Sequence, residues 1–457
     1  MQQDTAVDDA EFDAYARTVG RLGRLPADHP VRLRAERMAR TLVRDGRRSR
    51  RQAERDVRRL ADARLLAATA TGAADRREDA PLVPPARRAP AGELTAPRRC
   101  YVCKGHYRQV DGFYHMLCPG CAADNTARRG LTTDLRGRRA LLTGGRVKIG
   151  FQLALMMLRD GAELTVTSRF PHDTVRRFRA AEGSEQWLER LTVVGIDLRD
   201  PRQVLGLCER LRADGRPLDI LVNNAAQTLR RPPESYALLA AGEQGALPPG
   251  AAVVHAPGFR PMPALAAAWP VTGLAPALPS GEVLELADEA GLLPDTAAGN
   301  SWSARLGGLD PAEVLETQLV NALAPALLCD RLLPLLLASP HTARYIVNVT
   351  AVEGRFAVRN KTPGHPHTNM AKAALNMLTR TSAAELAARG VHMCAVDTGW
   401  ITDENPAPKK SRIAAAGFRT PLDIVDGAAR VYDPIVRGEA GAPVSGVFLK
   451  DYREAAW

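Results

Sequence analysis

Short runs of apolar and β-branched residues alternate with longer helical stretches from about residue 137 to the C-terminal end. Seven of these runs read RRALLTGG, AELTVTSR, LTVVGIDLRD, LDILVNNAA, ARYIVNVT, VHMCAVDTGW and SGVFLKD. Strands that are apolar almost throughout are buried on both faces, which requires helices on both sides of a mainly parallel sheet. The pattern therefore predicts a doubly wound α/β domain over residues 134–457.

One long segment interrupts this alternation. Residues 236–310 are rich in Ala, Pro and Gly, as in ALPPGAAVVHAPGFRPMPALAAAWP, and they separate the fourth predicted strand from the helix that follows it. The segment predicts an inserted subdomain or flap.

The N-terminal region follows a helical period instead. Over residues 1–75, Arg alternates with apolar side chains at spacings that a helix gathers on one side. These apolar residues are Leu33, Met38, Leu42, Val57, Leu60 and Leu65. An α-helical hairpin is the expected form, and the Pro- and Ala-rich residues 76–98 predict a linker after it.

Positive charge is concentrated in the same region. The chain has a net charge of +11, and residues 1–99 carry 22 Arg and no Lys against 15 Asp and Glu. Two interpretations stay open, namely solvated helix faces or a surface for nucleic acid or an acidic protein partner. No stretch approaches the roughly 18 apolar residues of a membrane span, so a cytoplasmic protein without a membrane partner is expected.

Four of the seven cysteines form two tight pairs. Cys100 and Cys103, then Cys118 and Cys121, give the spacing C-x2-C-x14-C-x2-C. Two such pairs offer four thiolates to one tetrahedral ion, and soft thiolates suit zinc. The spacing predicts a structural zinc module over residues 99–130, with uncoordinated thiols or an iron centre as alternatives. His106 and His115 lie between the pairs and are expected to be loop residues.

Several motifs point to a nucleotide cofactor. The segment DLRGRRALLTGGRVKIG places a glycine turn after the first strand, NNAA follows the fourth strand, and Asn321 and Lys372 lie in later helices. Over roughly residues 134–450 these features resemble the short-chain dehydrogenase/reductase family, whose members are NAD(P)-dependent Rossmann-fold enzymes. The resemblance implies a Rossmann-like sheet and leaves a homo-oligomer as an expectation taken from the family alone.

The glycine turn departs from the family pattern at one position. Its residues are Thr143, Gly144, Gly145, Arg146, Val147, Lys148, Ile149 and Gly150. Glycines at such a turn let the backbone approach a pyrophosphate, which the amides of the helix N-terminus then hold. The middle glycine of the family is Lys148 here, so its side chain either leans away from the cofactor or contacts a phosphate.

The resemblance also implies the cofactor preference. The second strand ends at Ser168 and Arg169 without the acidic residue that binds the ribose 2′-hydroxyl of NAD, whereas an Arg pairs with the 2′-phosphate of NADP. NADP(H) is therefore expected over NAD, with Arg146 or Lys148 adding to Arg169. Further contacts implied by the family fall on Asp197, Leu198, Asn223, Ala225, Thr398 and Gly399.

Only part of the family's catalytic tetrad has a counterpart. Asn321 resembles the helical Asn that holds a relay water, and Lys372 resembles the lysine that binds the nicotinamide ribose. Thr368 stands at the tyrosine position and Ala351 at the serine position, so the usual proton donor is missing. A threonine hydroxyl is a poor terminal acid.

Two histidines offer a replacement donor. His365 lies seven residues before Lys372, a spacing that resembles the Tyr-x6-Lys of enoyl reductases, and His367 adjoins Thr368. A histidine can act as an acid near neutral pH, although both residues also fit a loop that enters a helix. The leading hypothesis is an NADP(H)-dependent oxidoreductase acting on a carbonyl, an alcohol or an activated double bond. The alternative is a catalytically inactive NADP-binding scaffold or sensor, with a macromolecular partner at the zinc and Arg-rich regions.

Overall fold

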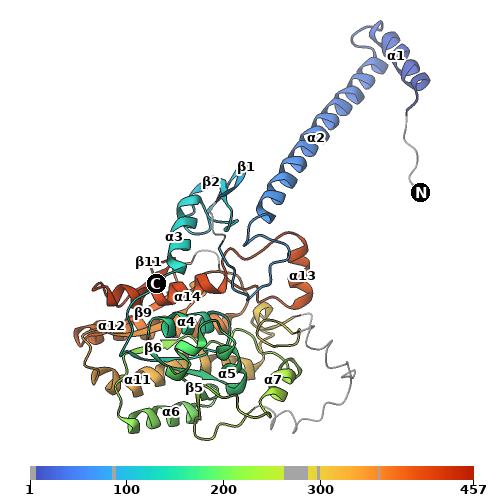
Figure 1. The fold of residues 1–457 in the computed structure, drawn as a ribbon. Helices are drawn as coiled ribbons and strands as arrows, with labels where there is room; N and C mark the ends of the chain where they lie inside the picture. The colour runs from blue at the N-terminus through green and yellow to red at the C-terminus, as the bar shows by residue number, and fades with distance from the viewer. Residues whose placement is uncertain (1–6, 85–88, 262–286, 296–298, 359–360) are drawn as a thin grey trace. The chain divides into compact units, whose positions relative to one another are not determined.

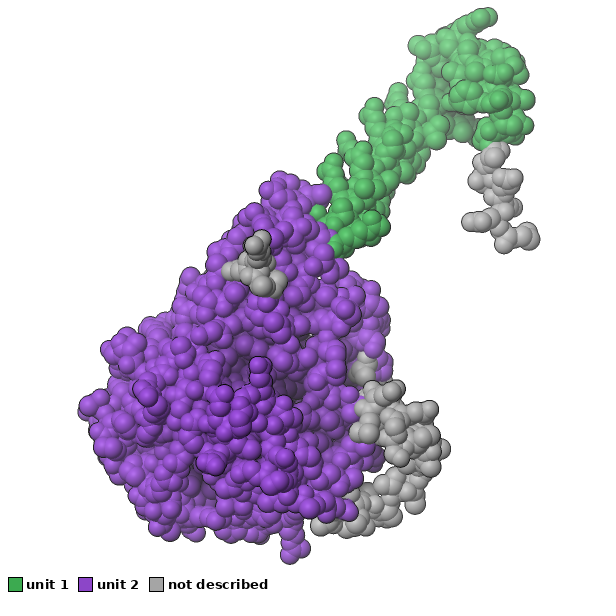
Figure 2. Space-filling model, viewed as in Figure 1, with its two compact units in different colours: residues 1–64 green, residues 65–457 purple. Residues whose placement is uncertain are grey.

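The computed structural model describes residues 7–84, 89–261, 287–295, 299–358 and 361–457. The chain forms two compact units, residues 1–64 and residues 65–457, which Figure 2 distinguishes by colour.

The first unit is helical. It contains α1 (Asp9–Gly23) and α2, which runs from Pro30 to Ala67 and so extends just past the unit's boundary. Asp8 caps α1, because its carboxylate accepts the N–H of Glu11 at 2.7 Å while the Glu11 carboxylate accepts the N–H of Asp8 at 3.2 Å. No residue of α1 is buried. The expected N-terminal helical region is confirmed. Of its apolar side chains, Leu33, Met38, Leu42, Val57 and Leu60 stay exposed, whereas Leu66 near the end of α2 is buried.

The second unit contains a nine-stranded sheet with the order β11-β10-β9-β8-β6-β3-β4-β5-β7. Every neighbouring pair is parallel except β10 with β11. The strands are β3 (Arg139–Leu142), β4 (Glu163–Ser168), β5 (Leu191–Gly195), β6 (Ile220–Asn223), β7 (Ala252–His255), β8 (Arg344–Thr350), β9 (Val391–Asp397), β10 (Phe448–Lys450) and β11 (Arg453–Ala455). All seven strands predicted from apolar runs are present, and the doubly wound fold class is confirmed.

Helices cover both faces of this sheet (Figure 1). Alternate strand residues face opposite sides, so Ala140 and Leu142 pack in one core cluster and Leu141 packs in the other. The first cluster includes residues of α4 (Lys148–Arg159), α5 (Pro171–Arg179) and α14 (Ile424–Glu439). The second includes residues of α6 (Pro201–Asp214), α11 (Ala324–Leu337) and α12 (Pro366–Ala388).

The sheet changes winding direction between β3 and β6. From β3 the chain winds outward through β4 and β5, then returns to place β6 on the other side of β3. In open α/β sheets, nucleotides bind outside the carboxyl ends of the strands at such a switch point. The glycine turn between β3 and α4 lies at this position.

The predicted insertion contributes to the sheet itself. Within residues 236–310, β7 pairs in parallel with β5 and extends the edge of the sheet, which the flap interpretation did not anticipate. Helix α7 (Ala237–Gly242) precedes β7. Residues 262–286 and 296–298 lie outside the described part, so the prediction stays an expectation for those residues.

The cysteine pairs lie in a small module at the start of the second unit. Its antiparallel strands are β1 (Pro90–Arg99) and β2 (His106–Asp111), and α3 (Pro119–Arg129) follows them. Residues 90–98, assigned to a linker from their composition, thus belong to a strand. They pair with β2 although Pro and Gly are unfavourable in a strand, which shows pairing overriding local propensity.

The remaining elements are short, apart from one apolar helical run. They are α10 (Pro311–Gln318), α13 (Ala407–Ala415), a π-helical turn at Leu319–Leu323, and 3₁₀ turns at Ser184–Gln186, Leu188–Arg190, Pro233–Tyr236, Ser301–Ser303 and Val352–Gly354. The run Pro311–Leu337 is long and apolar enough to cross a membrane by length and composition, which the sequence reading did not expect. Half of its most apolar window is buried in the fold, because α11 packs against the sheet.

Candidate functional site

The turn between β3 and α4 leaves no room for side chains at its glycines. A Cβ on Gly144, which has φ of 72°, would lie 3.0 Å from the Cα of Ala225. A Cβ on Gly150 would lie 2.1 Å from the carbonyl oxygen of Gly144, and one on Gly145 would lie 2.7 Å from the Cβ of Val166. No side chain caps α4, so its first amides remain able to bind an anion.

Lys148 begins α4 with a left-handed φ of 55°, and its side chain points to a carboxylate cluster. Its ammonium lies 2.9 Å from Oδ2 of Asp79 and 3.8 Å from Oε1 of Glu404. Burial alone raises the pKa of Asp79, but the Lys148 charge and hydrogen bonds from Lys148 and Thr402 outweigh it and lower that pKa. Thr402 donates its hydroxyl to Asp79 at 2.7 Å. An internal carboxylate thus pairs with the ammonium of the first residue of α4.

The end of β6 is tied to the glycine turn. The Thr143 hydroxyl accepts the backbone N–H groups of Asn224 and Ala225, each at 3.0 Å. The Asn224 amide donates to the carbonyl of Thr143 at 3.0 Å, and the Asn223 amide donates to Oδ1 of Asn348 on β8 at 2.8 Å. These bonds fix the spacing of the three strands that border the switch point.

Two arginines lie near the end of β4. The Arg169 guanidinium is 5.0 Å from the ring centre of Tyr236, which comes from the inserted segment. Among the described residues, no carboxylate forms a salt bridge with Arg169. Arg146 already has acceptors within the protein, because it donates to Oδ2 of Asp173 at 2.7 Å and to the carbonyl of Ala290 at 2.8 Å. Arg169 is therefore the cation available to a ligand here.

The other residues implied by the family are distributed around this edge. Asp197 follows β5, and its carboxylate is 2.6 Å from the guanidinium of Arg199. Leu198 is buried in the second core cluster. Thr398 and Gly399 follow β9 in a turn where Gly399 has φ of 84°. The Asp197 carboxylate is therefore already paired with Arg199.

Asn321 and Lys372 are both buried near the carboxyl ends of the strands. Asn321 lies in the π-helical turn, accepts the N–H of Gln227 at 2.7 Å and donates to its carbonyl at 2.9 Å. The Lys372 ammonium donates to the carbonyl of Val349 at 2.9 Å. Burial lowers the pKa of Lys372 to about 8 although Glu353 opposes this, so the amine is still mainly protonated at pH 7.

Polar groups without partners gather at the start of α12. Thr368 is 5% exposed, and its hydroxyl has no hydrogen-bond partner within the described chain. His365 stacks on Trp302 with ring centres 3.9 Å apart and keeps Nδ1 unpaired among these residues. His367 is fully buried, with Nε2 3.8 Å from Oε1 of Glu313. Burial lowers the pKa of both histidines.

The two histidines differ in their place on α12. His367 lies within the helix, and its ring faces α10, because Nε2 is 3.8 Å from the Glu313 carboxylate on that helix. His365 precedes the helix as its N-cap residue, with a left-handed φ of 41°. The helical period therefore does not place the His365 ring relative to Lys372.

The four paired cysteines converge on one point. Their sulfurs all lie within 4.8 Å of one another, and those of Cys103 and Cys118 are 3.7 Å apart. His115 is engaged elsewhere, because its Nδ1 lies 2.7 Å from the Thr71 hydroxyl. His106 begins β2 and is exposed rather than lying in a loop. A cluster of four thiols that can hold a metal ion is thus present.

The cysteine module also contacts the turn after β9. The backbone N–H of Trp400 donates to the Tyr101 hydroxyl at 2.8 Å. Burial raises the pKa of Tyr101 to about 12, so the phenol stays protonated at pH 7. Cys100 shares a core cluster with Ile401 and Leu422. Folding of the module therefore supports the turn that carries Thr398 and Gly399.

Asp79, Glu404 and Tyr101 were not among the site residues predicted from the sequence. Each reaches the site from a segment distant in sequence, and neither periodicity nor spacing marks them. The adjacent acids Glu78 and Asp79 in a Pro- and Arg-rich stretch were the only local signal, and an acidic pair is common in exposed segments.

The fold and glycine turn define a dinucleotide-binding α/β protein, and comparison with known proteins agrees. Residues 138–239 match the family described as short chain dehydrogenase, and residues 291–421 match the one described as enoyl-(acyl carrier protein) reductase. An uncharacterized protein of Acanthamoeba polyphaga mimivirus is 30% identical over 359 residues, covering 75% of this chain and 72% of that protein. The chain belongs to the short-chain dehydrogenase/reductase family, whose members are typically NAD(P)-dependent oxidoreductases.

Other similarities cover shorter parts of the chain. A probable oxidoreductase of Streptomyces antibioticus is 39% identical over 95 residues, covering 20% of this chain and 30% of that protein. Among solved structures, a short-chain dehydrogenase from Burkholderia cenocepacia in complex with NADP is 22% identical. It covers 69% of this chain and 97% of its own, with a TM-score of 0.45.

Proposed function

We propose that this chain is an NADP(H)-dependent oxidoreductase acting on a carbonyl, an alcohol or an activated double bond of a small molecule. The observation that carries the proposal is the Lys372 ammonium, which is buried and has one acceptor among the described residues, the carbonyl of Val349. An ammonium has three N–H donors, so two remain for hydroxyls of a nicotinamide ribose. The cofactor, when bound, supplies or accepts the hydride.

The residues near β4 fit a 2′-phosphate better than a ribose hydroxyl. Arg169 is half-buried and stacked on Tyr236, which holds the guanidinium in place without neutralising it. No Asp or Glu follows β4 directly to accept a 2′-hydroxyl. A positioned guanidinium pairs well with a phosphate dianion, which favours NADP(H) over NAD(H).

Replacing Arg169 by Asp should abolish the preference for NADPH. Loss of a charge-assisted pair with a phosphate costs roughly 1.5 to 3 kcal/mol, or about 10- to 150-fold in affinity. Titration of both reduced cofactors, followed by their fluorescence, measures the ratio. Arg179→Asp, at an exposed position on α5, makes the same charge change and should leave the ratio unaltered. Equal affinities in the unaltered protein would refute the assignment.

Asp79 is proposed to compete with cofactor phosphate for Lys148 and the Thr402 hydroxyl. Its carboxylate bridges these two groups beside the uncapped N-terminus of α4. A phosphate oxygen has the same charge and accepts the same hydrogen bonds. The segment around Asp79 is anchored by Arg76, which donates to the carbonyls of Thr420 and Leu422.

Asp79→Asn should therefore strengthen NADPH binding by about tenfold, equivalent to about 1.4 kcal/mol. The substitution removes one negative charge near the phosphates and frees the Lys148 ammonium. Glu78→Gln is the matched control, because Glu78 pairs with Lys410 instead. Weaker binding in Asp79→Asn would mean that Asp79 positions Lys148 for the cofactor rather than competing with it.

His365 is the proposed proton donor, acting beside or through the Thr368 hydroxyl. It is the N-cap residue of α12, seven residues before Lys372, and its Nδ1 has no partner among the described residues. Stacking on Trp302 fixes the ring. His367 remains the second candidate, with Glu313 nearby.

The cysteine cluster is proposed to hold one structural zinc ion. Tetrahedral zinc with bonds of about 2.3 Å to sulfur places the sulfurs about 3.8 Å apart. The separation of 3.7 Å between the sulfurs of Cys103 and Cys118 is close to that value. Four thiolates complete the coordination sphere, so the ion would support folding and would not bind substrate.

A second candidate function is an NADP-binding scaffold or sensor without turnover. The observation in its favour is Thr368, because an aliphatic hydroxyl stands four residues before Lys372, where this family carries a phenol. Normal NADPH binding without turnover of any carbonyl, alcohol or enone would favour this function over the oxidoreductase.

A further inference from the structure

One side of α2 consists of arginines. At 3.6 residues per turn they fall within about 100° of the helix circumference and extend along about 32 Å of its length. This arginine face comprises Arg37, Arg40, Arg44, Arg47, Arg48, Arg51, Arg55 and Arg58. The Asp and Glu residues in this stretch, Asp45, Glu54 and Asp56, point outside that sector by the same period.

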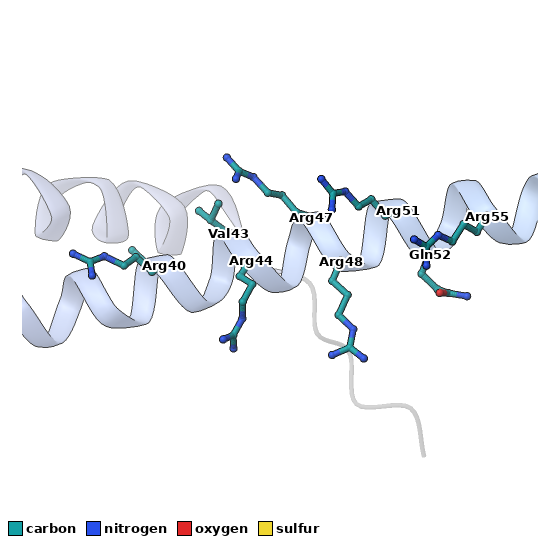
Figure 3. Close-up of a pocket in the computed structure, with 9 residues that line it drawn as sticks. Arg40, Val43, Arg44, Arg47, Arg48, Arg51, Gln52 and Arg55 are labelled. Atoms are coloured by element: carbon teal, nitrogen blue, oxygen red, sulfur yellow. The ribbon is translucent and has the colours of Figure 1, made fainter.

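The face is exposed and mostly unneutralised. Figure 3 shows six of its side chains extending away from the helix axis. Arg40 lies 3.6 Å from Glu36 and Arg44 lies 3.4 Å from Asp45. Within the described chain, Arg47, Arg48, Arg51 and Arg55 form no salt bridge with any carboxylate. Solvated surfaces usually intersperse both signs of charge, so this face has an excess that a polyanion would neutralise.

We propose that the arginine face binds the phosphate backbone of duplex nucleic acid without reading its sequence. Arginines three or four residues apart rise about 4.5 to 6 Å along α2, which brings successive guanidiniums within reach of successive phosphates. An α-helix about 10 to 12 Å wide fits the major groove of B-DNA, which is about 12 Å wide. The inference does not depend on the proposed oxidoreductase function.

The sequence of α2 favours a duplex over other polyanions. The helix has no aromatic residue, so it cannot stack unpaired bases as single-strand binders do. Among its exposed apolar residues, Val43 borders the arginine face, whereas Met38, Leu42 and Leu60 lie on the side away from it. A helix that inserted them into a membrane would turn the arginine face toward water. An acidic protein segment also lacks the dense, regular charge of a duplex.

The test uses the full-length protein and short random-sequence duplexes of DNA and of RNA, labelled for fluorescence anisotropy. Affinity for at least one duplex should fall steeply as salt increases, because each phosphate contact releases a counterion. Two double variants carry equal charge changes. Arg47→Gln with Arg51→Gln removes two members of the arginine face, whereas Arg50→Gln with Arg64→Gln removes two arginines outside it.

The first pair should reduce the slope of log affinity against log salt by about 1.8, and the second should leave it nearly unchanged. Gln keeps a high helix propensity, and circular dichroism checks that α2 is retained. Three results would each overturn the proposal. These are no binding to either duplex at low salt, equal losses in the two double variants, or tighter binding to anionic vesicles or an acidic peptide than to a duplex.

Discussion

A His365→Ala variant should bind NADPH normally and turn over about 100- to 10,000-fold more slowly, the loss expected when a general acid is removed. The reason is chemical, since the imidazole of His365 can donate a proton while Thr368 offers only an aliphatic hydroxyl. Oxidation of NADPH by a panel of carbonyl and enone substrates, followed at its absorbance band, provides the rate. Because burial lowers the pKa of His365, reduction should slow as pH rises through that lowered value.

Two further variants serve as comparisons for His365→Ala. His367→Ala should affect turnover less, because His367 faces Glu313 and α10. Lys372→Ala should weaken NADPH binding itself, since it removes the ammonium proposed to hold the ribose. If turnover exists and His365→Ala leaves it unchanged, the donor is another group. A loss of NADPH affinity in His365→Ala would instead show that the residue shapes the cofactor site.

The combined Cys100→Ser and Cys121→Ser variant should lose its zinc and most of its folded protein. Cys100 is 1% exposed and packs in a core cluster with Leu94, Tyr107 and Leu422, so the module cannot unfold without exposing that core. A structural zinc ion contributes folding free energy directly. Elemental analysis should find one zinc per chain in the unaltered protein, and thermal unfolding should show a large loss in the variant.

Cys208→Ala serves as the control for that experiment. Cys208 is as deeply buried as Cys100, but it packs in the core beneath α6, away from the cluster. It should keep the metal and lose only the stability expected from a small buried cavity, about 1 kcal/mol. A double variant that retains its metal, or an unaltered protein without zinc, would contradict the structural zinc site.

The sheet was predictable because its strands carry their own signal. Runs such as LTVVGIDLRD are apolar on both faces, and burial under helices is the arrangement that accommodates them. The cysteine cluster was equally predictable from the sequence, since its spacing brings four ligands together whatever the surrounding fold. Strand β7 was not recognised, because four residues within an Ala- and Pro-rich segment give no periodic signal before they pair with β5.

In the candidate site, only the residues on the glycine turn and the later helices were predictable, and not the partners that reach them from other segments. The glycine turn, Asn321 and Lys372 follow a family pattern, so their positions along the chain sufficed to nominate them. The partner of Lys148 did not follow from sequence, because Asp79 comes from a segment before the sheet begins. The support of the turn after β9 by Tyr101 likewise depends on how the cysteine module packs. Long-range contacts of this kind have no local periodicity.

The most direct test of this account is equilibrium binding of NADPH and NADH to the unaltered protein. Fluorescence titration should give saturable binding of one NADPH per chain, with NADH binding at least about tenfold more weakly, as expected for a missing phosphate contact of about 1.4 kcal/mol. Failure of both cofactors to bind would contradict the proposed NADP(H) site at the β3–α4 turn and Lys372.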